Sequence, residues 1–205
     1  MYTLTGVTKD YRKGRDTVHA LSGVGLTIGD GEWLAIQGPT GHGKTTLLQL
    51  LGGLDRPTAG SIEFGGQDFA AMTEAQLTRV RARAIGFVFQ TFNLIPTLSA
   101  AENVETALVP LRVPTAQRRA RAVKALASVG LADRARHLPA ELLRPTGNLD
   151  EGTRDEIIGL LERLWRDRGL TWVLVTHDSS LARRAQRTGL MTSGLLTVRP
   201  GSLTT

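Results

Sequence analysis

Apolar and polar residues recur with two different periods along the chain, and these periods predict strands and helices respectively. Partial two-residue alternation near the N-terminus, in 2–7 and 24–28, is typical of half-buried strands. Further strands are expected at 32–37, 61–64, 85–90 and 172–176, and helices at 45–51, 73–83, 115–129 and 153–168. The last helix has the clearest apolar face, formed at spacings i, i+3, i+4 and i+7 by Ile157, Leu160, Leu161 and Leu164. Strands interspersed with helices in this way predict an α/β fold.

Composition narrows the class of protein. With 205 residues, 41% of them hydrophobic, the chain is expected to form one domain over residues 1–205 with a substantial core. The absence of cysteine excludes a disulfide framework and agrees with a reducing cytosol. No signal-peptide pattern is seen, and no apolar run approaches the roughly 20 residues of a membrane span.

The net charge of +6 comes mainly from arginines, which are concentrated at 79–83 and 118–121. Neither cluster contains interleaved aromatic residues that could stack on bases, so nucleic acid is not the expected partner. Solvated helix faces are the ordinary interpretation of such clusters. Attraction to the acidic inner surface of a membrane is the functional interpretation that we favour.

Residues 38–46 match the phosphate-binding P-loop motif G-x-x-x-x-G-K-[ST] in full. Glycines allow the backbone to fold closely around an anion, and successive N–H groups together with a helix N-terminus supply positive potential. Lys44 is expected to reach the β- and γ-phosphates, and the Thr45 hydroxyl to ligate Mg²⁺. The candidate nucleotide-binding residues of this segment are Gly38, Pro39, Thr40, Gly41, His42, Gly43, Lys44, Thr45 and Thr46.

Four further residues match motifs in a fixed order along the chain. Tyr11 precedes the P-loop. After the P-loop come Gln90, which follows Phe87-Val88-Phe89, then Asp150 in the string PTGNLD, and His177 after Thr176. With them the chain resembles the nucleotide-binding subunit of an ABC transporter. The segments LGGLDRPTAG at 51–60 and PTGNLD at 145–150 are most similar to the lipoprotein-releasing and macrolide- or peptide-exporting group.

The resemblance implies ATP and Mg²⁺ as cofactors and a role for each motif. Tyr11 would stack on adenine, and Gln90 would contact Mg²⁺ or the attacking water. His177 would bind the γ-phosphate, so that His177 and Gln90 are the candidate catalytic residues, while Thr45 and Gln90 are the candidate metal contacts. The segment of Asp150 would lie at the interface between two identical subunits. A membrane-spanning transporter subunit is the implied partner, with this chain cytoplasmic and peripheral on the inner face of the membrane.

The implied fold is a P-loop NTPase-type parallel sheet flanked by helices, with an N-terminal antiparallel β subdomain and a helical insertion. The helical subdomain would cover about 91–143 in truncated form. Read alone, each of these residues also has an ordinary interpretation: Tyr11 as a surface aromatic, Gln90 as a polar strand end, His177 as a structural histidine and Asp150 as an acid near a helix N-terminus.

The family pattern breaks between Pro139 and Pro145, where the sequence is Pro-Ala-Glu-Leu-Leu-Arg-Pro. The LSGGQ signature, its helix, the Walker B strand with its aspartate, and the catalytic glutamate are absent together. Neither Glu141 nor Asp150 follows an apolar strand, so neither is placed to replace these carboxylates. We therefore expect impaired hydrolysis, and a core sheet that lacks one strand beside the P-loop strand.

Alternatives remain open at this point. Asp178, after the apolar run 172–176, could hold Mg²⁺ if that strand moved into the vacant place. The chain could also be an internally deleted, non-hydrolysing nucleotide-binding remnant. A P-loop kinase or a nucleic-acid-linked ATPase is the alternative of another class.

Overall fold

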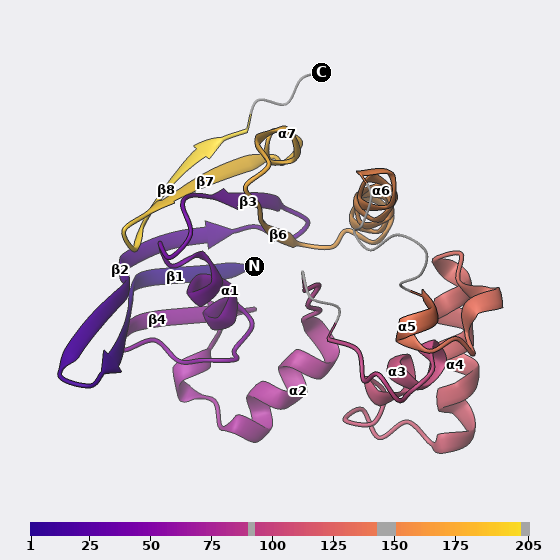
Figure 1. Cartoon of the computed structure of the whole chain (residues 1–205). Helices are drawn as coiled ribbons and strands as arrows, with labels where there is room; N and C mark the ends of the chain where they lie inside the picture. The colour runs from indigo at the N-terminus through magenta and orange to yellow at the C-terminus, as the bar shows by residue number, and fades with distance from the viewer. Residues whose placement is uncertain (90–92, 143–150, 202–205) are drawn as a thin grey trace. The chain divides into compact units, whose positions relative to one another are not determined.

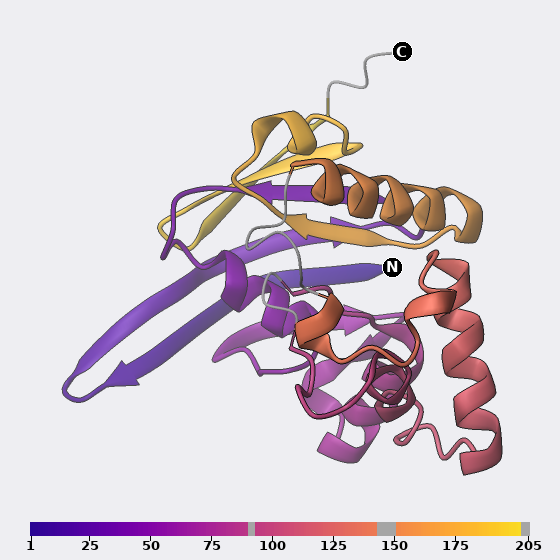
Figure 2. The ribbon, with the colours of Figure 1, turned by 45° about the vertical axis from the view of Figure 1, so that its right-hand side comes forward.

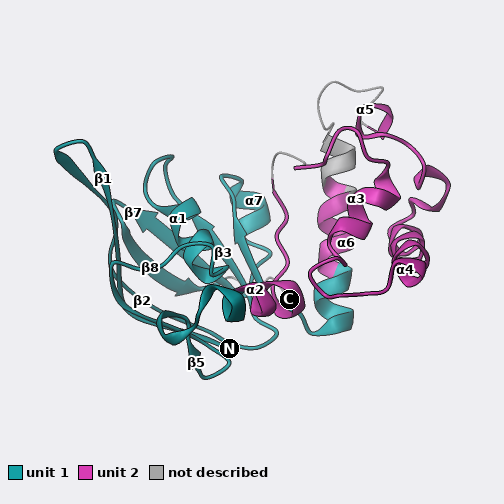
Figure 3. Ribbon diagram, turned by 90° about the horizontal axis from the view of Figure 1, so that it is seen from below, with its two compact units in different colours: residues 1–77, 163–205 teal, residues 78–162 magenta. Residues whose placement is uncertain are grey.

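The structure is a computed structural model that describes residues 1–89, 93–142 and 151–201. The chain divides into two compact units, which Figure 3 shows in different colours. The first unit contains residues 1–77 and 163–205, and the second contains residues 78–162. In the described part of the chain, no helix is both long enough and apolar enough to cross a membrane.

An antiparallel sheet with the strand order β2-β1-β4-β5 forms one part of the first unit (Figure 1). Its strands are β1 (Tyr2–Lys13), β2 (Asp16–Ile28), β4 (Ala59–Phe64) and β5 (Gln67–Asp68). β1 and β2 are longer than expected, because the predicted segments 2–7 and 24–28 are only the inner parts of a long hairpin that pairs as far as Lys13 and Asp16. The tip of this hairpin extends beyond the other strands of its sheet (Figure 2).

The second sheet, also in the first unit, has the order β6-β3-β7-β8. Its strands are β3 (Trp33–Gln37), β6 (Trp172–Val175), β7 (Arg187–Thr192) and β8 (Leu195–Pro200). β3 pairs in parallel with β6 on one edge and with β7 on the other. The expectation that a strand would be missing beside β3 is therefore wrong, because both of its edges are occupied. Within the described residues, β6 pairs with β3 alone, so the vacant edge belongs to β6.

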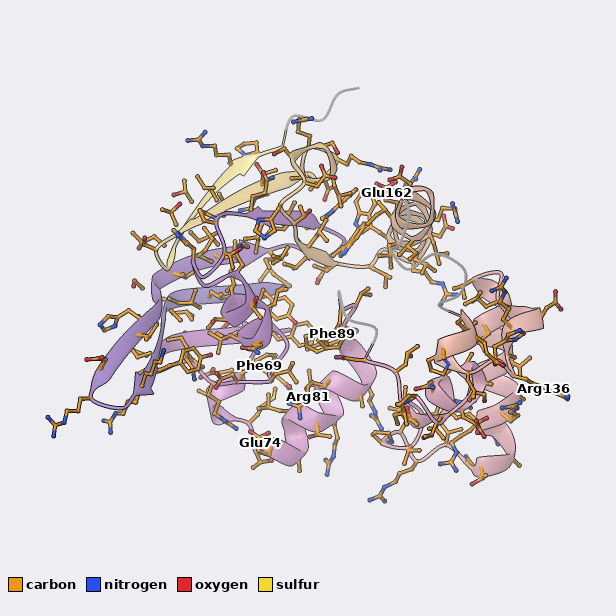
Figure 4. The ribbon with its side chains drawn as sticks, in the orientation of Figure 1. Phe69, Glu74, Arg81, Phe89, Arg136 and Glu162 are labelled. Carbon is orange, nitrogen blue, oxygen red and sulfur yellow. The ribbon has the colours of Figure 1, made fainter. Side chains whose placement is uncertain are left out.

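Helix α1 (Lys44–Leu51) follows β3 and is anchored at its end by the first strand. The buried Tyr2 hydroxyl donates a hydrogen bond to the Leu51 carbonyl at 2.9 Å, and burial raises the pKa of Tyr2 to about 12. The Tyr2 ring packs with Phe64 and with Phe69, which is labelled in Figure 4, at centroid distances of 4.7 and 6.4 Å. This aromatic cluster joins the antiparallel sheet to the short helix η1 (Phe69–Ala71).

The second unit is helical and has a small core of its own. Helix α2 (Glu74–Ala84) enters it, followed by α3 (Ala100–Thr106), α4 (Thr115–Ser128), η2 (Ala132–Arg134), α5 (Pro139–Leu142) and most of α6 (Glu151–Arg168). The buried core residues are mostly alanines: Ala100, Ala101, Ala122, Leu126 and Ala135. Ser99 and Glu102 form a capping box at the start of α3, which fixes where this helix begins.

Two expected apolar elements lack the cover that the sequence predicts for them. Residues 85–89 form no strand, and Val88 is 74% exposed, because no described strand pairs with this segment. In α6, Ile157 is exposed and Leu160, Leu161 and Leu164 are only half-buried, although their spacing predicts a core-facing side. Both elements thus have apolar sequences that are typical of buried structure, but their apolar side chains are exposed or only half-buried.

Candidate nucleotide-binding site

Residues 38–46, which comprise the loop after β3 and the first residues of α1, form a phosphate cradle that neighbouring backbone encloses closely. Gly38 has φ 144° and Gly43 has φ 99°, values that favour glycine. A Cβ added at Gly38 would lie 2.1 Å from the Met191 carbonyl oxygen, and one at Gly43 would lie 2.2 Å from the Ala20 carbonyl oxygen. Only glycine fits both positions, so the cradle's backbone path is set by β7 on one side and β2 on the other.

Lys44 begins α1 and holds its charge inside this loop. Its side chain is only 6% exposed, and Nζ donates to the carbonyl oxygens of Gly38 at 2.7 Å and Pro39 at 2.6 Å. An ammonium group has three donors, so one remains after these two bonds. The amides of the first turn of α1 have no partner within the helix. The cradle therefore combines one buried cation with several backbone donors, which is the donor set that a phosphate group requires.

The turn between β7 and β8 fixes the cradle through His42. The Ser193 amide donates to His42 Nδ1 at 2.9 Å, and the Gly194 amide donates to the His42 carbonyl at 3.3 Å. The Ser22 amide in turn donates to the Gly194 carbonyl at 2.9 Å. Because Nδ1 accepts a hydrogen bond, the neutral imidazole carries its proton on Nε2.

Tyr11 lies beside the end of the cradle on strand β1. Its hydroxyl donates to Asp55 Oδ2 at 2.9 Å, and its side chain is 37% exposed. Burial, and then the hydrogen bond to Asp55, raise the pKa of Tyr11, while the neighbouring Thr46 side chain acts in the opposite direction. The structure thus brings Tyr11 next to Thr46 of the cradle, and its contact with the base of a nucleotide stays a prediction.

His177 is exposed in the bend after β6, at the same sheet edge as the cradle. The Thr176 amide donates to the Ile36 carbonyl at 3.1 Å, which continues the parallel pairing of β6 with β3 up to this point. Carboxyl ends of parallel strands share one edge of a sheet, so His177 and Gly38 both follow strand ends on that edge.

Asp178 has a structural role that accounts for its carboxylate. Its Oδ1 accepts from the amides of Ser180 at 2.7 Å and Leu181 at 3.2 Å, which caps α7 (Ser179–Ala182). The alternative that Asp178 holds Mg²⁺ gains no support from this arrangement. Within the described residues, no group of three or more histidine or acidic side chains is placed to hold a metal ion.

Two predicted site residues, Gln90 and Asp150, lie outside the described residues. Pro39, Thr40 and Thr45 are exposed along the cradle, and Thr45 lies in the first turn of α1. The sequence did not indicate Asp55, Lys9, Ser193 or Gly194 as residues of the site. A basic residue two positions before Tyr11 on a strand was the only sequence signal for Lys9, because residues i and i+2 share a face.

A profile of the ABC transporter family matches residues 21–158. The chain belongs to the ABC transporter family. The lipoprotein-releasing system ATP-binding protein LolD of Geobacter metallireducens is 40% identical, and the match covers 92% of this chain and 94% of LolD. The macrolide export ATP-binding/permease protein MacB of Azoarcus sp. is 38% identical over 97% of this chain, which spans only 34% of that longer protein. Among solved structures, the ATP-binding cassette MJ0796, a dimer in a post-hydrolysis state bound to ADP and Pi, superposes with a TM-score of 0.87 at 35% identity over 98% of both chains.

The alignments also reveal missing residues. The match to LolD runs over 211 positions but contains only 92% of the 205 residues, about 189, so LolD has about 22 residues without a counterpart here. The match to MacB runs over 221 positions and contains 97% of the chain, about 199 residues, which again leaves about 22. Both values agree with an internal deletion, and the motif order breaks only between Pro139 and Pro145.

Proposed function

We propose that this chain is the ATP-binding subunit of an ABC-type export complex, that it binds ATP with Mg²⁺ in the phosphate cradle, and that it hydrolyses ATP slowly or not at all. One observation carries the proposal. The cradle keeps its glycine-walled backbone and its buried Lys44, whereas the sequence lacks the Walker B aspartate and the catalytic glutamate.

Binding is supported by how well the cradle fits a phosphate chain. Lys44 and the first-turn amides of α1 supply donors in a loop that excludes even a methyl group at Gly38 and Gly43. Mg²⁺ prefers oxygen ligands, and we assign the Thr45 hydroxyl and the Gln90 side chain to it alongside phosphate oxygens. When bound, Mg²⁺ neutralises the charge that develops on those oxygens.

Hydrolysis requires a group that orients water and accepts its proton, and such a group typically contributes about 10²–10⁴-fold. We assign His177 to a hydrogen bond with the terminal phosphate, because it follows β6 at the edge of the sheet where β3 leads into the cradle. It cannot replace two carboxylates, one that acts on water and one that supports the metal shell. Asp178, the next acid along the chain, caps α7.

The same loss affects assembly. LolD and MacB are named as parts of release and export systems, and MJ0796 was solved as a dimer. We infer that this chain pairs with a membrane-spanning subunit on the inner face of the membrane and with a second copy of itself, with the segment of Asp150 at the interface. Without the LSGGQ segment, each nucleotide in such a dimer would lose the contacts of the partner's signature.

Nucleotide binding is tested with a fluorescent ATP analogue and Mg²⁺, comparing the wild type with Lys44→Ala and Lys124→Ala. Lys124 is an exposed lysine of α4, so its variant has the same change of charge far from the cradle in sequence. We expect Lys44→Ala to abolish binding, because it removes the buried cation, and Lys124→Ala to bind like the wild type. Retained affinity in Lys44→Ala would refute the assignment of the cradle.

Hydrolysis is tested by phosphate release in membranes that contain the transporter partner, with an intact LolD-type subunit as the reference. We expect turnover lower by about 10²–10⁴-fold than the reference, together with measurable ATP binding. Turnover equal to that of the reference would refute the proposed loss of ATP hydrolysis. A chain that binds no nucleotide and shows no cooperative unfolding would instead identify a remnant without function.

A further inference from the structure

Next to the cradle lies a cluster of three side chains, Lys9, Tyr11 and Asp55, to which the proposed phosphate binding assigns no part. Asp55, in the loop after α1, accepts hydrogen bonds from Lys9 Nζ at 2.7 Å and from the Tyr11 hydroxyl at 2.9 Å. Lys9 also donates to the Arg56 carbonyl at 2.8 Å, and its Nζ lies 4.9 Å from the centroid of the Tyr11 ring. The cluster therefore fixes both the hydroxyl end and one face of the tyrosine.

We infer that Asp55 and Lys9 are positioning residues that hold the Tyr11 ring as a platform for the base of the nucleotide, and that this platform favours purines. The inference rests on the proposed ATP binding. It adds what the proposal leaves open, namely which residues orient the ring and which bases it accepts.

Lys9 leaves one face of the Tyr11 ring open to a base. Lys9 occupies one face as a cation–π contact, so a base can stack only on the opposite face. Val18 lies directly across from Tyr11 in the β1–β2 register. Both side chains are large, apolar and exposed, Tyr11 to 37% and Val18 to 48%, on a hairpin that extends beyond its sheet (Figure 2). An exposed aromatic–aliphatic pair of this kind suits a flat apolar ligand.

The cluster sets the distance between the Tyr11 ring and the cradle. Asp55 follows α1 by four residues, and α1 begins at Lys44. Strand β1 is tied to the same loop by the Thr58 amide, which donates to the Thr8 carbonyl at 2.8 Å, and by the Thr58 hydroxyl, which accepts from the Asp10 amide at 3.0 Å. The loop after α1 is therefore fastened to the strand that carries Tyr11, and Asp55 continues this connection to the ring itself.

The open face of the Tyr11 ring also affects which nucleotide bases bind best. Stacking uses the π-face of a base and does not read its hydrogen-bonding edge. Purines offer a larger π-face than pyrimidines, so ATP and GTP should bind about equally, and both more tightly than CTP or UTP. The charge of Asp55 does not repel the nucleotide strongly, because Lys9 neutralises it at 2.7 Å.

The test measures binding of ATP and of tripolyphosphate, each with Mg²⁺, by calorimetry. Tripolyphosphate carries the phosphates without the base, so it reports on the cradle alone. We expect Tyr11→Ala to weaken ATP binding by about tenfold, the loss of one stacked base. Asp55→Ala should weaken it by about twofold to tenfold, since the unpinned ring must be ordered on binding. Tripolyphosphate should bind both variants like the wild type.

Asp16→Ala is the matched control, because Asp16 is an exposed acid on the same hairpin and its loss changes the charge equally. It should leave both affinities unchanged. If Asp55→Ala does not fold, Asp55→Asn and Tyr11→Phe replace it. Each of these variants should weaken ATP binding by about twofold to fivefold and leave tripolyphosphate binding unchanged. Equal losses of ATP and tripolyphosphate would show a merely structural role, and no loss of ATP affinity would show no role. Both outcomes overturn the inference, as would CTP binding as tightly as ATP. A wild type that binds neither ligand would instead refute the proposed function.

Discussion

Strands β3 and β6 lie side by side in one sheet, yet they differ in burial and in pairing. All four apolar residues of β3 are buried, and the strand is paired on both edges. β6 has an equally apolar sequence, Trp-Val-Leu-Val, but each of its residues is only half-buried, and it pairs with β3 alone within the described residues. Within the described residues, the vacant edge and the missing cover are therefore on β6, while the strand that leads into the cradle is buried and paired on both sides.

Under the proposed function, this difference accounts for nucleotide binding without hydrolysis. The cradle depends on β3, β7, β2 and the turn between β7 and β8, and all of these elements are present. A segment that carried the missing carboxylates would fit the vacant edge of β6. The loss of such a segment would remove catalytic groups without disturbing the backbone of the cradle.

Restoring the lost segment tests whether the missing carboxylates limit turnover. We would replace Leu143 and Arg144 by the corresponding segment of the Geobacter metallireducens LolD relative. Turnover should rise by about 10²–10⁴-fold, because the carboxylates that act on water and metal return. Phosphate release measures the effect. The control is the same insertion with its carboxylates changed to alanine, which should restore only stability. No rise in turnover with the intact insertion would show that other differences limit catalysis.

A matched pair of leucines tests the burial of the two strands directly. Leu34 of β3 is fully buried, whereas Leu174 of β6 is half-buried. Leu34→Ala should lower the free energy of unfolding by about 2–5 kcal/mol, the usual cost of a core cavity. Leu174→Ala should cost clearly less, since solvent already reaches the site. Urea denaturation gives both values, and equal costs would contradict the difference in burial.

Two glycines of the cradle test how closely β3 and its neighbours enclose the phosphates. Gly41 and Gly43 both have positive φ, at 84° and 99°, but a Cβ at Gly41 meets nothing within 4 Å. Each alanine variant carries backbone strain of about 1–2 kcal/mol. Only Gly43→Ala adds a clash with the Ala20 carbonyl, so it should lose far more ATP affinity than Gly41→Ala. Calorimetry measures the two affinities, and similar values would mean that the backbone of β2 does not constrain the cradle.

The smallest effect concerns pH and the Asp55 cluster. Burial opposes ionisation of Asp55, but the hydrogen bonds from Lys9, the Arg56 amide and Tyr11 together lower its pKa. A carboxyl group with a lowered pKa in the folded state stabilises the protein above its unfolded pKa of about 4, and this contribution is lost as the pH falls through the folded value. The stability advantage of the wild type over Asp55→Asn should therefore be constant from about pH 5 to 8 and shrink below about pH 4. A stability advantage of the wild type that grew as the pH fell would contradict a lowered pKa of Asp55.

The sequence predicted this protein best where the information is local. Nine consecutive residues specify the cradle, and the structure gives them the expected strand–loop–helix context. Sequence also predicted the long helix over 153–168, because helical periodicity depends on spacing within one segment. It failed for 85–89, which has a strand-like sequence, because a strand forms only when another strand supplies hydrogen bonds.

Contacts between residues that are far apart in the sequence are visible only in the three-dimensional structure. His42 contacts Ser193 across 151 positions, and Tyr11 contacts Asp55 across 44, and neither pair has a signature in the sequence. The place of the vacant sheet edge was likewise settled by strand order, which put β6 and β7 on either side of β3. Motifs record the chemistry of a segment, whereas pairing between segments depends on how all the strands and helices pack together. The family, the motif of the phosphate cradle and the missing catalytic groups are thus readable in the sequence, whereas the contacts that support the cradle are visible only in the fold.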